Sequence, residues 1–381
     1  MTLSTLAGET GKNSMPTAVR AMLVGGLIYL FLVGVSSLEQ GIKVMGQDTQ
    51  EQLFSNVSNP IAGLCIGILG TVLVQSSSAS TSVIVGLVAA GAIDIETAVP
   101  MIMGANIGTT VTNTLVSLGS ARRSDEFRRA FATATVHDFF NVIAVAVLLP
   151  LELLTGVLSN AAGRLSELLV GSSGSEWKSP IKAWVKTPVG WIEDLESSLG
   201  LGGTALGVTM VLTGLVLIIV SLGLITKNMR LLIADRVERS MNSVLSKGSG
   251  SVAMLLGVVI TMLVQSSSIT TSILIPMSAA GVLAIRNAYP VTLGANVGTT
   301  ITALLAALAS SSPDALTVAL VHTLFNVTAI VILYVPRFIR DVPIYCAEWL
   351  ARIAAARPVW AVGYVMGAFI VLPLVVFAIA R

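Results

Sequence analysis

The residues best suited to chemistry form two copies of one polar, uncharged sequence. Residues 71–91 read TVLVQSSSASTSVIVGLVAAG and residues 261–281 read TMLVQSSSITTSILIPMSAAG, identical at twelve of twenty-one positions. At the same offset of 190 residues, GANIGTT at 104–110 returns as GANVGTT at 294–300. Both motifs carry hydroxyl and amide groups, whose oxygens can bind a small cation and whose donors can bind an anion.

No Lys, Arg, Asp or Glu accompanies these polar groups. The ranges free of all four are 61–91, 100–119, 251–281 and 290–309. A neutral site in a low-dielectric surrounding binds a bare polyvalent anion at high cost, and a co-bound cation removes that cost. We therefore predict an anion carried together with Na⁺, because proton coupling more often uses a carboxylate inside the membrane.

Composition indicates what kind of protein must position these groups. The 381 residues are 54% hydrophobic and only 11% charged, less than half the charged share of about 25% in soluble domains. With 22 Lys and Arg against 20 Asp and Glu, the chain has no basic excess for a nucleic acid. A water-soluble enzyme, a nucleic-acid binder and a disordered tail are all disfavoured, and an all-α polytopic membrane protein is predicted.

Seven stretches are long and apolar enough to be full spans; they are 18–38, 95–118, 129–150, 205–226, 290–309, 314–336 and 358–380. Four others, 39–59, 151–200, 227–250 and 337–357, mix charge with apolar spacing, as interfacial helices do. Sixteen of the 22 Lys and Arg lie inside if the N-terminal segment 1–17 is cytoplasmic. The segment 151–204 is then an extracellular or periplasmic loop, and the C-terminus lies outside.

The duplication predicts two units, 18–150 and 205–336, followed by an amphipathic segment and a final span in 337–381. HDFFN at 137–141 is echoed by HTLFN at 322–326, which supports the same division. Three spans in each unit, an odd number, make the second unit enter from the opposite side. Inverted repeats of this kind are typical of transporters, which place matching sites near the bilayer midplane.

The QSSS segments do not look like ordinary spans. The range 61–91 would be roughly 46 Å long as one helix, well beyond the hydrocarbon thickness of about 30 Å. We expect re-entrant hairpins over 61–91 and 251–281, with QSSS at each tip and a serine capping the second arm. We also expect GAN-x-GTT to break the helices at 95–118 and 290–309, because glycine permits unwinding and threonine can cap a restart.

Paired QSSS tips, paired GAN-x-GTT segments and FRRAFATATVHDFFNV at 127–142 resemble the type II sodium/phosphate cotransporter family over roughly residues 20–380. The chain is most similar to the short bacterial NptA-type members. This resemblance implies a symporter that imports inorganic phosphate with Na⁺ by alternating access, with no enzymatic activity and no organic cofactor. It implies a bacterial inner-membrane protein, and it leaves monomer and homodimer open.

The resemblance also assigns site residues. For phosphate, it implies Gln75, Ser76, Ser77 and Thr110 with the counterparts Gln265, Ser266, Ser267 and Thr300. For sodium, it implies Gln75, Ser78, Asn106 and Thr109 with the counterparts Gln265, Ser268, Asn296 and Thr299.

Other interpretations of these residues remain open. Serine and threonine can simply pack membrane helices, and Asn106 and Asn296 can bond helices together. For His137 and His322 we favour a structural role, and for Asp138 a structural or coupling role. A Na⁺-coupled carrier of another oxyanion or a small carboxylate is the nearest rival. An intramembrane serine hydrolase is a more distant one, because no GxSxG-like nucleophile turn is present.

Overall fold

The computed structural model describes residues 15–54, 59–170, 179–247, 249–310, 312–357 and 359–380. Residues 1–14, most of the expected cytoplasmic N-terminal segment, lie outside the described residues, as do residues 171–178 of the expected outer loop. The described part of the chain is helical and contains no strand, which confirms the all-α class.

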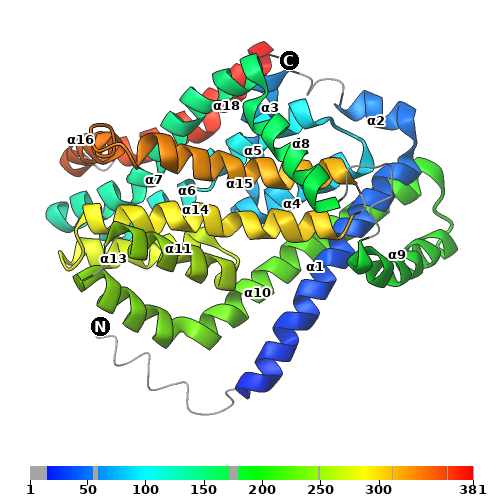
Figure 1. Cartoon of the computed structure of the whole chain (residues 1–381), viewed down its shortest axis with the longest axis horizontal. Coiled ribbons are helices and arrows are strands. Elements are labelled where there is room, and N and C mark those ends of the chain that lie inside the picture. Colours follow the sequence, from blue (N-terminus) through cyan, green and yellow to red (C-terminus); the bar gives the residue numbers. More distant parts are fainter. Residues whose placement is uncertain are drawn as a thin grey trace.

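The first half of the chain supplies a long helix, a hairpin and a second group of long helices (Figure 1). Its elements are α1 (Thr17–Met45), α2 (Gln47–Phe54), α3 (Pro60–Val74), α4 (Ser77–Ala90), α5 (Ile95–Gly108), α6 (Val111–Ser117), η3 (Leu118–Ser120), α7 (Ser124–Thr155), α8 (Val157–Val170) and α9 (Pro180–Ser198).

The second half repeats the pattern of long helix, hairpin and long helices. Its elements are α10 (Gly203–Lys247), α11 (Gly250–Val264), α12 (Ser267–Ser272), α13 (Leu274–Ala279), α14 (Ile285–Leu308), α15 (Pro313–Leu333), α16 (Val342–Ala356), α17 (Val359–Met366), η4 (Gly367–Val371) and α18 (Leu372–Ala380).

Within the described residues, six helical stretches are long and apolar enough to cross a membrane. They are Thr17–Met45, Ser124–Thr155, Gly203–Leu232, Ile285–Leu308, Pro313–Leu333 and Val359–Ala380. These stretches confirm a polytopic membrane protein. The remaining predicted span, 95–118, is not one helix, because α5 ends at Gly108 and α6 begins at Val111.

Helix α10 is longer than the sequence pattern predicted. We expected a span at 205–226 followed by a separate interfacial segment, but α10 continues for 45 residues from Gly203 to Lys247. The range 227–247 contains neither glycine nor proline, so no residue in it stops the helix when the membrane-like composition ends.

Small residues bring α1 and α10 into close contact along their length. A Cβ atom added to Gly34 would lie 3.0 Å from the carbonyl oxygen of Gly214. A Cβ atom added to Gly41 would lie 2.8 Å from the carbonyl oxygen of Gly207. Close backbone approach at small residues is a common way for membrane helices to associate. The two glycine pairs therefore fix the crossing of the first helices of the two halves.

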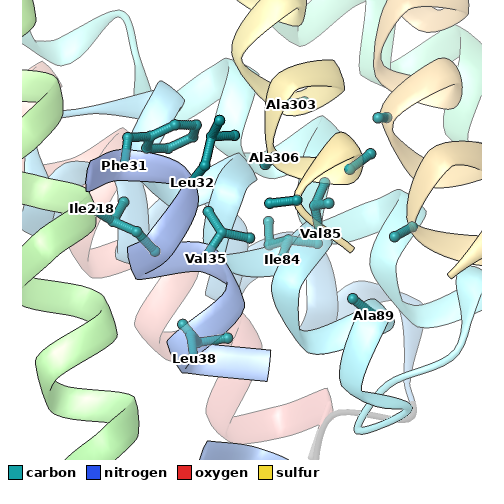
Figure 2. Packing of buried hydrophobic residues seen from close by; sticks show 14 of the residues in the cluster. Phe31, Leu32, Val35, Leu38, Ile84, Val85, Ala89, Ile218, Ala303 and Ala306 are labelled. Atoms are coloured by element: carbon teal, nitrogen blue, oxygen red, sulfur yellow. The ribbon is translucent and has the colours of Figure 1, made fainter. Parts of the chain in front are cut away.

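The other face of α1 packs against the first hairpin (Figure 2). Val35 of α1 points toward Ile84 of α4, and Leu38 lies beside Gly86 of the same helix. Helix α4 also packs against α14. The second arm of the first hairpin is thus held between α1 and a helix of the second half. In the same way, α12 and α13 of the second hairpin pack against α6 and α7 of the first half. In each hairpin, the first arm packs against a helix of its own half, α3 on α5 and α11 on α14, and the second arm packs against the other half.

Candidate functional site

The first hairpin turns at Gln75. Helix α3 ends at Val74, and Gln75 adopts a left-handed backbone conformation with φ 56°. Ser76 is extended, and its hydroxyl accepts a hydrogen bond from the Ala79 amide at 3.2 Å, which caps α4. A serine cap satisfies one of the free amides at a helix start. The QSSS sequence therefore makes the turn itself, as the expected hairpin tip requires.

The second hairpin has the same turn. Gln265 has φ 58°, and the Ser266 hydroxyl accepts from the Ile269 amide at 3.4 Å. Among the described residues, Gln75 and Gln265 are the two non-glycine residues with positive φ. The second arm differs, because it divides into α12 and α13. Pro276, the third residue of α13, lacks the amide that would bond the carbonyl of Ser272, the last residue of α12.

The two tips meet in one cavity of about 250 Å³. Helix α10 closes one side of it. The lining residues from the first hairpin are Val74, Gln75, Ser76, Ser77, Ser78 and Ala79; those from the second are Gln265, Ser266, Ser267 and Ser268; those from α10 are Ile219, Leu222, Gly223 and Thr226. None of these described lining residues is charged or is a histidine. The structure thus brings together all eight QSSS residues in a neutral site.

Hydrogen bonds join the two tips directly. The Ser78 hydroxyl donates to the Gln265 carbonyl oxygen at 3.3 Å and lies 3.2 Å from the Thr302 hydroxyl. Thr302 in turn donates to Gln265 Oε1 at 2.8 Å. The equivalent threonine of the first half, Thr112, donates to Gln75 Oε1 at 3.0 Å.

Thr112 and Thr302 are functional candidates that the sequence analysis missed. They stand at the same offset of 190 residues, two positions after each GTT. That shared offset was the available signal.

The glutamine side chains are held in a defined orientation. The amide nitrogen of Gln75 donates to the Val72 carbonyl, and that of Gln265 donates to the Met262 carbonyl. Because the nitrogen is engaged in its own helix, Oε1 is the atom presented to the threonine. The start of α4 also opens on the cavity, so its free amides and the positive end of its dipole face the same space as the glutamine oxygens.

The GAN-x-GTT segments lie outside this cavity. The expected break is present in the first half, where α5 ends at Gly108 and α6 begins at Val111, and is wrong for the second half. Helix α14 runs unbroken through 294–300, and Thr109 and Thr110 both keep right-handed helical dihedrals between α5 and α6. The four threonine hydroxyls bond carbonyls of their own helices: Thr109 to Ala105, Thr110 to Ile107, Thr299 to Ala295 and Thr300 to Val297.

The motif glycines serve packing instead of unwinding. A Cβ atom at Gly104 would clash with the Leu64 carbonyl of α3, and one at Gly294 would clash with the Met254 carbonyl of α11. The requirement for glycine therefore comes from the neighbouring hairpin arm in each half. The division between α5 and α6 falls at Thr109 and Thr110, whose dihedrals stay helical, so the glycines themselves unwind neither helix.

The motif asparagines form a separate buried cluster between the two halves. Asn141 Nδ2 donates to the Asn106 carbonyl at 2.9 Å, and Asn296 Nδ2 donates to Asn141 Oδ1 at 2.8 Å. Asn296 Oδ1 also contacts His137 Nε2, and Asn326 Nδ2 reaches Asn106 Oδ1 at 3.4 Å. We call these five residues the amide cluster. It joins α5, α7, α14 and α15. Asn106 and Asn296 thus hold helices together, which is one of the two roles considered for them from the sequence.

Asp138 and His322 are the next buried ionisable residues along α7 and α15, and in the described part of the chain their side chains make no hydrogen bond to the amide cluster. Asp138 Oδ2 accepts from the Tyr364 hydroxyl at 3.0 Å and from the Thr114 hydroxyl at 3.4 Å. His322 accepts at its backbone carbonyl from Asn326 Nδ2, at 2.9 Å. Asp138 Oδ1, Asn326 Oδ1 and the Nδ1 atoms of both histidines are buried and have no partner within the described residues.

The fold and the paired tips define a multi-pass helical membrane protein with two hairpins that share one neutral cavity. A model of the Na⁺/Pi-cotransporter family matches residues 30–171 and 217–339. The chain belongs to this family.

Two relatives of the chain are mammalian proteins. The chain is 34% identical to the rat sodium-dependent phosphate transport protein 2A, over 95% of this chain and 68% of that protein. It is 32% identical to the human sodium-dependent phosphate transport protein 2B, over 95% of this chain and 65% of that protein. No solved structure matches the chain.

Proposed function

We propose that this protein is a sodium-coupled symporter that carries inorganic phosphate into the cell. One observation carries the proposal: two QSSS tips, each turned by a left-handed glutamine, meet in a single uncharged cavity. The names of the relatives, sodium-dependent phosphate transport proteins, agree with it.

Phosphate binds between the serine tips in this proposal. Ser76 and Ser77 with Ser266 and Ser267 supply hydroxyl donors, and the start of α4 adds backbone amides and the positive end of a helix dipole. Gln75 and Gln265 border the same space. Thr110 and Thr300, which bond their own helices, are replaced in this role by Thr112 and Thr302, which bond the two glutamines.

Sodium supplies the positive charge that the cavity lacks. We assign one sodium position to the tips, where glutamine Oε1 atoms, Ser78, Ser268 and the carbonyls that end α3 and α11 offer oxygen ligands. The assignment follows from charge, because a polyvalent anion in a neutral low-dielectric site needs a nearby cation.

Asn106 and Asn296 remain candidate sodium ligands, at a second position in the amide cluster. That cluster contains the unpartnered oxygen of Asn326, and an amide oxygen is a suitable ligand for a hard cation. Thr109 and Thr299 bond their own helices and are secondary candidates there.

We further propose that the two halves are inverted repeats, with the N-terminus cytoplasmic, and that alternating access moves the hairpins against the other helices. Each hairpin packs on helices of the opposite half, so a shift between the halves would part the tips. Ser78 and Gln265 would lose their contact in such a movement.

A carrier is favoured over an intramembrane serine hydrolase. A hydrolase needs a base within hydrogen-bond reach of its serine, and none of the described residues lining the cavity is histidine, aspartate or glutamate. Of the two histidines, His137 directs Nε2 at Asn296.

The test is uptake of ³²P-phosphate by proteoliposomes that contain the purified full chain. An inward Na⁺ gradient is compared with an equal K⁺ gradient and with a proton gradient alone. We expect uptake with Na⁺ only, competed by arsenate more than by sulfate or succinate. Equal uptake with K⁺ would show that transport is not coupled to sodium. Stronger competition by succinate than by arsenate would show that the protein is a carboxylate carrier.

A further inference from the structure

A second polar cavity lies at the base of the second hairpin, apart from the tips. Its volume is about 300 Å³. Helix α7, the end of α13, the turn at 280–284 and α16 surround it. Its polar lining residues are Arg128, Arg129, Thr133, Ser278, Glu348 and Arg352. We call it the base cavity.

The base cavity carries excess positive charge, unlike the cavity at the tips. Three guanidinium groups face one carboxylate, that of Glu348. Arg129 is engaged, because its Nε and Nη2 atoms donate to the Ala279 carbonyl at 3.0 and 2.8 Å. Within the described residues, Arg128 and Arg352 make no ion pair or hydrogen bond. Two guanidinium groups are thus free to bind an anion.

Two buried hydroxyl groups at the same cavity also have no partner. Thr133 is 4% exposed and Ser278 is 1% exposed, and both hydroxyl oxygens are unbonded within the described residues. Thr135, one half-turn along α7, bonds the Phe131 carbonyl at 2.8 Å in the usual helical way. Buried hydroxyl groups nearly always have a hydrogen-bond partner. A ligand in this cavity would supply the partner that Thr133 and Ser278 lack.

We propose that the base cavity is a second oxyanion site, which binds a phosphate group through Arg128, Arg352, Thr133 and Ser278. Guanidinium groups match the geometry of phosphate oxygens and bind them by charge-assisted hydrogen bonds. Because the site has its own positive charge, it binds without sodium. The phosphate group comes from free phosphate or from the headgroup of an anionic lipid, whose chains would lie along Leu283 and Ile285.

The first experiment measures ³²P-phosphate binding to the purified full chain by scintillation proximity in K⁺ buffer without Na⁺. We expect saturable binding that the double variant Arg128→Gln, Arg352→Gln weakens by about tenfold or more. The control Arg122→Gln, Arg337→Gln removes two exposed arginines that do not line the cavity and should bind as wild type. Ser77→Ala with Ser267→Ala should also leave this sodium-independent binding unchanged, so the result does not depend on the proposed transport site.

The second experiment tests the lipid source. The same variants are placed in phosphatidylcholine nanodiscs with or without phosphatidylglycerol, and retained lipid is measured by native mass spectrometry. Phosphatidylglycerol retained by wild type and lost in the Arg128→Gln, Arg352→Gln variant supports the site with a lipid occupant. Arg352→Lys preserves the positive charge and should retain part of the binding. Partial binding by this variant would show that the loss in the double variant is not caused by misfolding. The proposal is overturned if neither phosphate nor phosphatidylglycerol binding depends on Arg128 and Arg352.

Discussion

The hydroxyl of Ser78, at the start of α4, donates a hydrogen bond at 3.3 Å to the backbone carbonyl of Gln265, at the tip of the other hairpin. The two residues are 187 positions apart in the chain. The Gln265 carbonyl follows the last turn of α11, where carbonyls lack helical partners. One half of the protein thus satisfies the backbone of the other half at the centre of the candidate site.

Replacing Ser78 by alanine should therefore impair both the site and the fold. The change removes the contacts with Gln265 and Thr302 and leaves a buried carbonyl without its donor, at a cost of about 1–3 kcal/mol. We expect lower thermal stability in detergent and strongly reduced sodium-driven phosphate uptake. Ser80→Ala is the matched control, because the Ser80 hydroxyl only bonds the Ser76 carbonyl within its own helix. Equal effects of the two changes would contradict this role of Ser78.

Substitutions of Gln265 can distinguish the role of its left-handed backbone from the role of its side chain. Glycine adopts positive φ without strain, whereas a non-glycine residue there costs about 1–2 kcal/mol. Gln265→Gly should therefore keep or raise the melting temperature while abolishing uptake, because the side-chain oxygen is lost. Gln265→Val should lower both, because a β-branched residue is worse in this conformation. Normal uptake by Gln265→Gly would show that the glutamine serves only to form the turn.

The two threonines that bond the glutamines should have unequal effects. Thr302 contacts both Gln265 and Ser78, whereas Thr112 contacts Gln75 alone. Thr302→Val should therefore reduce the apparent phosphate affinity more than Thr112→Val, measured as the phosphate dependence of uptake at saturating Na⁺. A Thr302→Val, Ser78→Ala double variant should show a non-additive effect, because the two hydroxyls are in contact. Strict additivity would contradict a shared network.

Two glycines of α3 provide a test of packing within one helix. A Cβ atom at Gly67 would clash with the Met101 carbonyl of α5, while one at Gly70 meets nothing within 4 Å. Gly67→Ala should sharply lower the yield of monodisperse protein. Gly70→Ala should be neutral or stabilise by up to about 1 kcal/mol, because alanine favours helix more than glycine does. A fluorescence-detected size-exclusion profile distinguishes these results. Equal profiles would contradict the packing of α3 on α5.

Much of this architecture could be predicted from the sequence because duplication exposes it. The apolar runs at 314–336 and 358–380 locate α15 and the last helices within a few residues. The QSSS tips could be located because about thirty apolar residues with a polar centre cannot cross a bilayer as one straight helix. Ser76 and Ser266 cap as expected because the serine side chain favours that position.

The remainder depended on contacts between distant segments. The GAN-x-GTT motifs predicted a helix break in each half, which is present between α5 and α6 but absent from α14. Gly104 and Gly294 are required by carbonyls of α3 and α11, which sequence spacing does not reveal. Asn106 and Asn296 were grouped with the tips, yet both bond to Asn141 of α7 in the amide cluster. A residue's type indicates which bonds it can make, and only the packing of helices decides where it makes them.

The most direct test of the central claim, one shared phosphate site built by both tips, is a binding stoichiometry. Sodium-dependent ³²P-phosphate binding is taken as the difference between Na⁺ and K⁺ buffers for wild type, Ser77→Ala and Ser267→Ala. We predict about one sodium-dependent phosphate per wild-type chain, and its affinity should fall in both variants. Two phosphates per chain, with each variant losing one and keeping the other unchanged, would contradict a shared site.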